Sequence, residues 1–414
     1  MKTNALITAF GMLLMGTLAH AHEQPKSKTC SQPDVIRTAA QVDAARAELL
    51  RLQIDGGLQT NIPPAAQQAI SSMKSALGNF VNEYMHCASG QPDGKKLQSD
   101  ISALVHTFVL PPGQYSNEQL PPDFGKYGFE LWFDVRATQD PKLVGITADF
   151  SIKCGGDTVL FVFAPEGDSW REVLRWQSKP YDTVAGGTMA FAYGISPQDE
   201  AHGWYVVIHN IAPWCSSTWS SIRYQVLRPT ADPLQPKVIL SKSDFMWWSN
   251  EDYGKVVVGK NEFDLRFHSS SIDGGVHNRV FIRHYSVLGD TVRRTQPVAV
   301  SPRDFVDEWI VSPWEEASRW SEKSSLTHLQ QAHKMMSRKQ KAAHTLLEYD
   351  SIYRCPDGKR YQVGLAEMSG PKFDNEKSVY FFVTGDELFT MVGVSEVPDP
   401  KCDGPNLLEK MATK

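Results

Sequence analysis

The stretch Glu262–Val287 reads EFDLRFHSSSIDGGVHNRVFIRHYSV. Its two ends, EFDLRFH and RVFIRHYSV, alternate apolar or aromatic residues with polar ones, and a Ser- and Gly-rich segment separates them. A period of two is typical of strands with one buried face, and a Gly-rich link between two such runs indicates a hairpin. The stretch therefore predicts two antiparallel strands joined by a turn.

Similar runs continue upstream as far as Phe129. They are rich in β-branched and aromatic residues, are separated by Gly, Pro, Asn and Asp, and read FELWFDV, TVLFVFA, WREVLRW, WYVVIHN and IRYQVL. Consecutive strands without intervening helices favour an antiparallel meander over a βαβ fold.

An internal repeat gives this meander a period. VILSKSDF (Val238–Phe245) returns sixty residues later as VAVSPRDF (Val298–Phe305), and Ile222-Arg223 recurs as Ile282-Arg283. Periods of this order, built from several strands, are typical of propeller blades. We predict a mainly β protein with a repeated, β-propeller-like meander. A β-sandwich is the alternative, because Phe129–Phe305 has room for three units, or four if Leu97–Phe124 contributes, and propellers close with four to eight blades.

Ser271, Asp273 and Gly275 have the S-x-D-x-G spacing that resembles the Asp-box hairpin of sialidase-like β-propellers. Asn278 stands where that motif carries an aromatic residue. The resemblance implies a structural turn between two outer strands of a blade and no catalytic residue. A generic Asp-Gly-Gly turn is the alternative.

The segments around the meander predict further domains. Helical spacing in Asp34–Ile54, and again from Pro63-Pro64 to Tyr84, predicts a helical hairpin. The predicted organisation is a signal peptide at 1–21, the helical hairpin at 22–96, the β-meander at 97–312, a helical connector at 313–349 and a small disulfide-closed β tail at 350–414.

The N-terminus predicts export. Lys2 precedes the short apolar run Ala5–Leu18, and Ala19-His20-Ala21 matches a signal-peptidase site. We expect cleavage near His22 and a periplasmic or secreted protein.

Six cysteines remain after that cleavage, an even number for an oxidising compartment. Fifteen pairings are possible, and the regions of the chain favour Cys30 with Cys87, Cys154 with Cys215, and Cys355 with Cys402. None lies in a CxxC motif, so structural disulfides are predicted.

Charge and motifs limit the partners. The formal charge of −5 argues against nucleic acid as a partner, and no apolar run is long enough to span a membrane.

No cofactor is predicted, because nucleotide-binding and metal-binding motifs are absent from the sequence. His328, His333 and His344 do not have the spacing of a zinc site, so they are predicted to lie on a solvated face. The sequence does not predict an oligomeric state.

Aromatic residues and carboxylates follow each copy of the repeat. Aromatic faces stack on sugar rings and carboxylates bind hydroxyls, so these residues are candidates for ligand binding. The set is Trp247, Trp248, Asp252, Asp307, Glu308, Trp309 and Trp314.

Core packing is the alternative for the tryptophans. The first functional hypothesis is an exported, non-enzymatic binding or scaffold protein whose ligand is a protein or a glycan. The second is a secreted glycoside hydrolase with a carboxylate pair at the repeat junctions.

Overall fold

The fold is described from a computed structural model of the 414-residue chain. The structure describes residues 32–55, 61–90, 93–109, 121–178, 184–188, 190–213, 219–247, 254–273, 279–373 and 375–408. The predicted signal peptide lies outside these residues. Within them, no helix combines the length and apolarity needed to cross a membrane.

Four antiparallel sheets of four strands make up most of the structure, and each joins four consecutive strands in a meander. Sheet A contains β1 (Leu131–Gln139), β2 (Lys142–Ile152), β3 (Gly155–Glu166) and β4 (Ser169–Gln177). Sheet B contains β5 (Ala190–Ile195), β6 (Val206–Ile211), β7 (Trp219–Arg228) and β8 (Lys237–Trp247). Sheet C contains β9 (Lys255–Val258), β10 (Glu262–Ser269), β11 (Arg279–Leu288) and β12 (Thr291–Arg294). Sheet D contains β13 (Thr345–Arg354), β14 (Arg360–Ser369), β15 (Asn375–Thr384) and β16 (Thr390–Ser395). The predicted mainly β fold with repeated antiparallel meanders is confirmed.

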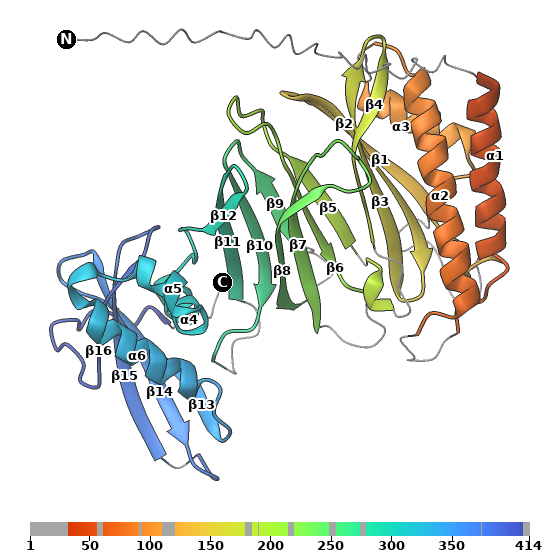
Figure 1. Ribbon diagram of the computed structural model, residues 1–414. Coiled ribbons are helices and arrows are strands. Elements are labelled where there is room, and N and C mark those ends of the chain that lie inside the picture. The colour runs from red at the N-terminus through yellow and green to blue at the C-terminus, as the bar shows by residue number, and fades with distance from the viewer. Residues whose placement is uncertain are drawn as a thin grey trace, which may run out of the picture.

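Sheets A, B and C stand side by side like propeller blades, whereas sheet D lies beyond a group of helices (Figure 1). Helices α1 and α2 cover the free face of sheet A at the opposite end of the molecule (Figure 1). The blades therefore form an open row and do not close into a ring.

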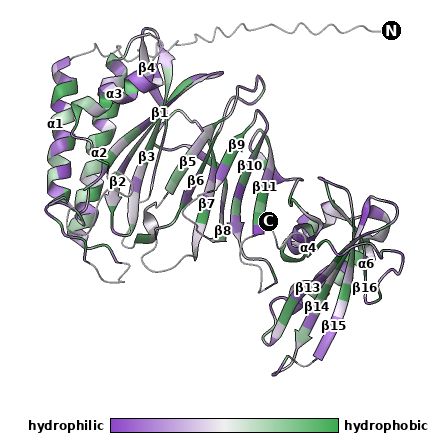
Figure 2. Ribbon diagram, turned by 180° about the vertical axis from the view of Figure 1, so that it is seen from behind, coloured by the Kyte–Doolittle hydropathy of each residue, from purple (hydrophilic) through white to green (hydrophobic). Residues whose placement is uncertain are grey.

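Strand β3 of sheet A is buried on both faces. Along β3, Val159, Phe161 and Phe163 belong to the core shared with the helices, while Leu160 and Val162 belong to the core shared with sheet B. A strand buried on both sides has a continuous apolar sequence instead of an alternating one, as TVLFVFA does. Figure 2 shows the corresponding hydrophobic segments along the sheets.

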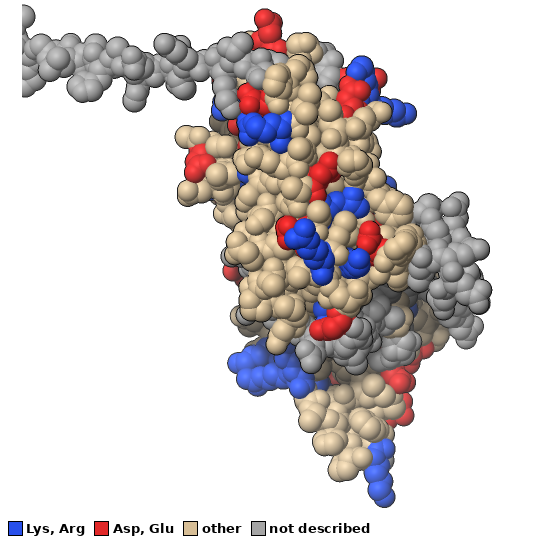
Figure 3. Space-filling model, turned by 90° about the vertical axis from the view of Figure 1, so that its right-hand side faces the viewer, with Lys and Arg blue, Asp and Glu red and all other residues tan. Residues whose placement is uncertain are grey.

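The N-terminal helices are α1 (Gln32–Leu49), α2 (Pro64–Cys87) and α3 (Gly94–Leu104). The hairpin predicted from helical spacing is present as α1 and α2, and Pro64 begins α2 as expected for proline in a first turn. Buried Lys74 ties α2 to sheet A, because its Nζ lies 2.8 Å from Asp157 on β3 and donates to the Ser178 hydroxyl at 2.7 Å. Figure 3 shows the helix-covered side of the molecule, where acidic and basic side chains are interspersed.

A second helical group connects sheet C to sheet D. It consists of α4 (Pro302–Val311), α5 (Trp314–Ala317) and α6 (Leu326–Lys339), which share one core with sheet D. The helical segment thus begins at Pro302, earlier than the predicted boundary at 313, and β13 begins at Thr345, before the predicted boundary at 350.

The two copies of the predicted repeat adopt different structures. Val238–Phe245 lies in strand β8, whereas Val298–Phe305 leads into helix α4. Pro302 and the Ser301 cap explain the difference, because the Ser301 hydroxyl accepts the Asp304 backbone N–H at 3.1 Å. Ile222-Arg223 and Ile282-Arg283, in contrast, do occupy equivalent places, on the third strands of sheets B and C.

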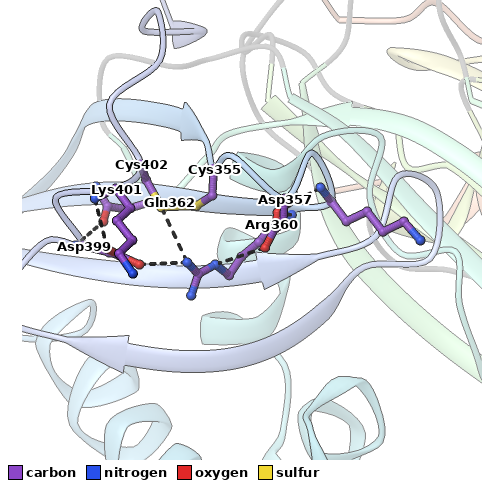
Figure 4. The surroundings of a disulfide bond; sticks show 8 residues. Cys355, Asp357, Arg360, Gln362, Asp399, Lys401 and Cys402 are labelled. Atoms are coloured by element: carbon purple, nitrogen blue, oxygen red, sulfur yellow. Dashed lines mark hydrogen bonds and ion pairs between the residues drawn. A yellow bond between two sulfur atoms is a disulfide. The ribbon is translucent and has the colours of Figure 1, made fainter.

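The disulfide Cys355–Cys402 is present and closes sheet D, as predicted (Figure 4). Cys87 and Cys154 are also disulfide-bonded. Cys30 and Cys215, their predicted partners, lie outside the described residues, so these two pairings stay predictions.

Candidate functional site

A cleft of about 520 Å³ lies between sheets A and B. Its walls come from β1 and β2 on one side and from β5 on the other, so it forms where the first strands of two neighbouring blades face each other. We name it the acidic cleft, after three of the residues that line it, Glu130, Asp134 and Asp149. Arg136 is the only cation among its described lining residues.

Strand pairing places two of these carboxylates on one face. In the β1–β2 register Asp134 lies opposite Thr147, and Trp132 lies opposite Asp149. Asp134 and Asp149 are therefore diagonal neighbours, a relation that separates residues by roughly 7–8 Å. Two carboxyl groups at such a spacing can contact the same small ligand.

The two carboxylates have different surroundings. Asp149 is 8% exposed and accepts a hydrogen bond from the Thr158 hydroxyl. Burial raises the pKa of Asp149 to about 6, although hydrogen bonds from Thr158 and Thr147 lower it. Asp134 is more exposed and accepts a hydrogen bond from Arg136 Nε at 2.8 Å. The cleft therefore contains two different carboxyl groups. Asp149 becomes protonated in mildly acidic solution, whereas Asp134 forms an ion pair with Arg136.

Aromatic side chains complete the walls of the acidic cleft. Trp132 and Phe191 are half-buried, and Tyr193 is buried beneath the Arg136 guanidinium, whose carbon lies 5.0 Å from the ring centre. The Tyr193 hydroxyl has no hydrogen-bond partner among the described residues. Partly exposed aromatic faces beside carboxylates suit a ligand with both CH faces and hydroxyl groups, as sugars have.

Asp149 gives a stability prediction. A carboxyl group whose folded pKa is raised from 3.8 to about 6 destabilises the fold as pH rises through that interval. Asp149→Asn should therefore increase the free energy of unfolding at pH 7.5 by roughly 2–3 kcal/mol, with little effect near pH 3.5. Urea denaturation at the two pH values measures the difference, and an equal effect at both values would contradict the prediction.

The sequence-predicted residues Asp307 and Glu308 lie elsewhere, on helix α4, where they contact arginines of sheet C. Glu308 Oε1 accepts hydrogen bonds from Arg283 at 3.0 Å and from Arg294 at 2.7 Å, while Oε2 accepts one from Arg279. Asp307 accepts from Arg279 at 2.9 Å. Together with Asp244 these residues form a buried arginine–carboxylate network.

Charges within this network are matched. Arg279, Arg283 and Arg294 face the carboxylates of Asp244, Asp307 and Glu308. Burial alone would raise the pKa of Glu308, but the three arginines outweigh it and hold the pKa well below its usual range. A cavity of about 460 Å³ adjoins the network. Because its arginines already have carboxylate partners, we assign the network a structural role.

Each remaining candidate is placed separately. Trp309 is fully buried, and its indole N–H donates to Ser321 at 2.9 Å, so no face is open for stacking. Trp314 is half-buried and packs edge-on against Trp309, and Trp247 is half-buried at the end of β8. Trp248 and Asp252 lie outside the described residues. The described members of the predicted set do not line one common pocket.

His333 and Asp273, two residues singled out in the sequence, both make buried contacts. His333 is buried between Trp309 and Trp314 and bonds the Ser312 carbonyl at 3.0 Å, so the predicted solvated face is wrong for this histidine. The Asp273 carboxylate accepts the Tyr349 backbone N–H at 3.1 Å, which links the predicted turn to sheet D. The rest of that turn, residues 274–278, lies outside the described residues.

Sequence reasoning missed the acidic cleft, although part of its signal was present. In FELWFDV, Trp132 and Asp134 are two residues apart and thus share one face of a strand. Asp149 interrupts the otherwise apolar end of β2, and a carboxylate in a buried strand is unusual.

Comparisons with known proteins are sparse. No protein-family model matches the sequence, and no curated protein matches it. A solved structure similar to this chain is a mutant α-L-arabinofuranosidase from Fusarium graminearum in complex with an iminosugar inhibitor. The two chains are 8% identical with a TM-score of 0.25, over 72% of this chain and 68% of that chain. A likeness this distant does not bear on function.

Proposed function

We propose that this protein is an exported binding protein that holds a glycan in the acidic cleft. The observation that carries the proposal is the combination of half-buried Trp132 and Phe191 with the carboxylates of Asp134 and Asp149 in one cleft of about 520 Å³. Sugar rings stack on aromatic faces, while their hydroxyl groups donate to carboxylates. Export remains an expectation from the N-terminal sequence.

Charge supports a neutral or cationic ligand for this cleft. The described lining of the cleft has three carboxyl groups, those of Glu130, Asp134 and Asp149, and one cation, Arg136. Arg136 already pairs with Asp134. A carboxylate brought into the cleft would therefore meet like charge, which opposes binding. We expect neutral oligosaccharides to bind better than acidic ones in the acidic cleft.

The first test is a binding screen of the purified, oxidised mature protein on arrayed oligosaccharides. Trp132→Ala should weaken retention of the bound glycan by roughly tenfold or more, because it removes the stacking face. Phe245→Ala is the matched control, since Phe245 is 58% exposed on β8, at the other edge of sheet B. Equal retention by both variants would contradict the proposal.

Hydrolysis of the bound glycan is the second candidate function, favoured by the raised pKa of Asp149. In this reaction protonated Asp149 donates its proton to the glycosidic oxygen while the bond from that oxygen to the anomeric carbon breaks. Water attacks the anomeric carbon and gives its proton to Asp134. Each fragment leaves with a hydroxyl group, and proton exchange with solvent then returns the proton to Asp149 and removes it from Asp134 before the next turnover.

Turnover separates these two functions. An enzyme should release reducing ends most rapidly near or below pH 6, because Asp149 loses its proton above its pKa of about 6. Asp149→Asn should then abolish release while retaining the glycan on the array. If the wild-type protein bound glycans but released no reducing ends, the result would support the non-enzymatic function and exclude hydrolysis of those glycans.

A further inference from the structure

A second cavity, of about 640 Å³, lies between sheets A and B on the side of strands β4, β7 and β8. Its polar lining includes Arg223, Lys242, Asn210, Gln177 and Ser243. We call it the basic cavity. It is separate from the acidic cleft, although Trp176 in its wall stacks on Phe191 of that cleft with ring centres 5.0 Å apart.

Arg223 is the unusual residue of this cavity. Its side chain is half-buried on β7, yet it forms no hydrogen bond or ion pair among the described residues. Burial lowers the pKa of Arg223, and no carboxylate in the described part of the chain offsets that effect. A guanidinium group stays charged at physiological pH, and burying a charge without a partner costs free energy. An anion that paired with Arg223 would remove this cost.

Arg283, the equivalent arginine of sheet C, has carboxylate partners. Arg283 occupies the same place on β11, the third strand of sheet C, sixty residues further along. Its Nε and one terminal nitrogen donate to both oxygens of Asp244 at 3.0 and 2.8 Å, and its other terminal nitrogen donates to Glu308 at 3.0 Å. Among the described residues, Arg283 is paired by carboxylates, whereas Arg223 at the matching position is not.

The remaining lining of the basic cavity also favours an anion. Lys242 is exposed and forms no ion pair among the described residues. Arg175 is already neutralised by Glu172, which it contacts through two hydrogen bonds of 2.7 Å. No carboxylate is found among the described residues that line this cavity. Asn210 and Gln177 can donate amide N–H groups in the same cavity as Arg223 and Lys242.

We infer that the basic cavity binds an oxyanion, the carboxylate or phosphate group of a small ligand, through Arg223. The guanidinium group presents parallel N–H donors that match two oxygens of such a group. Lys242 adds a point charge and the amides of Asn210 and Gln177 add neutral donors. This inference does not rest on glycan binding in the acidic cleft, because it uses other residues and the opposite charge.

Calorimetric titration of the purified protein with three probes tests the inference. Glucuronate carries a carboxylate, glucose is its neutral counterpart, and inorganic phosphate represents the phosphate source. We expect glucuronate or phosphate to bind and glucose to bind at least tenfold more weakly. Arg223→Gln should weaken binding of the anionic probe by roughly tenfold to a hundredfold. The matched control is Arg266→Gln, which removes a half-exposed arginine from sheet C.

The outcomes are distinct. Binding of glucuronate alone identifies a carboxylate ligand, and binding of phosphate alone identifies a phosphate-bearing one. The inference is overturned if neither anion binds, if glucose binds as well as the anions, or if Arg223→Gln binds like the wild type. Should Arg223→Gln fail to fold, the Nε–H resonance of Arg223 in the wild-type protein decides, because an anion bound there must shift it. Loss of glycan retention in Trp132→Ala would neither support nor contradict this site, so the two proposals fail independently.

Discussion

Glu308→Ala should lower the free energy of unfolding by about 3–5 kcal/mol, the loss expected when one partner of a buried ion pair is removed. Glu308 is 1% exposed and accepts hydrogen bonds from Arg279, Arg283 and Arg294. Without its carboxylate, the three buried guanidinium groups keep the carboxylates of Asp244 and Asp307 and, at 3.3 Å from Arg294, that of the more exposed Glu316. Denaturant unfolding at pH 7.5 measures the loss.

A neighbouring glutamate provides the control for Glu308→Ala. Glu315 on α5 pairs with Arg319 at 2.8 Å, but its side chain is 85% exposed, so Glu315→Ala should cost less than about 1 kcal/mol. Two variants of similar cost would contradict a special role for the buried network.

The pH dependence gives an independent check on Glu308. Burial would raise its pKa, but the arginines outweigh it and lower the pKa from an ordinary value of 4.5. The stability that Glu308 contributes is therefore present above pH 4.5 and lost as the pH falls below it. The stability difference between the wild type and Glu308→Ala should accordingly narrow in acid. A difference that stays constant from pH 7.5 to pH 3 would contradict this assignment.

Local patterns in the sequence predicted the strands and helices well. Alternation in Glu262–His268 and in Arg279–Val287 predicted two paired strands, and β10 and β11 confirm them. Pro63-Pro64 predicted the start of α2. These features depend on neighbouring residues, whose geometry the backbone determines directly.

The candidate site depended on contacts between distant residues. Trp132 and Phe191 are fifty-nine positions apart in the sequence, and they line one cleft only because sheets A and B stand face to face. No periodicity within β1 or β5 encodes that packing. The two repeat junctions also have different structures, because Val298–Phe305 leads into a helix where the earlier copy is a strand.

Arg223 and Arg283 show that a sequence repeat can predict the position of a residue in the fold without predicting its partners. Ile222-Arg223 and Ile282-Arg283 recur at equivalent strand positions, yet their surroundings differ because sheet B supplies Asp244 to Arg283. In the β7–β8 pairing Arg223 lies opposite Ser243, which carries no charge. A repeated residue thus predicted a repeated position, whereas its partner depended on the neighbouring sheet.

Replacing both Cys355 and Cys402 by Ser should destabilise sheet D by about 4 kcal/mol. The disulfide joins residues 47 positions apart, and a cross-link over a loop of this length restricts the unfolded chain by about that amount. It connects Cys355, directly after β13, to Cys402 in the segment after β16 (Figure 4), and thus links the two ends of the chain that forms the sheet. The loss should therefore concentrate in sheet D and in the helices that share its core.

Hydrogen exchange with the intact and the double-Ser protein locates this effect, because amides that open locally exchange without global unfolding. Exchange should accelerate in β13–β16 and in α6 while sheets A and B remain protected. Arg360→Gln is the control, since it removes the 2.7 Å ion pair with Asp399 beside the disulfide but leaves the cross-link intact. Both partners are partly exposed, so this change should cost less than about 1 kcal/mol. Equal acceleration of exchange in all four sheets would contradict this prediction. It would mean that the disulfide stabilises the whole chain as one cooperative unit, whereas the separate core of sheet D indicates that this sheet unfolds by itself.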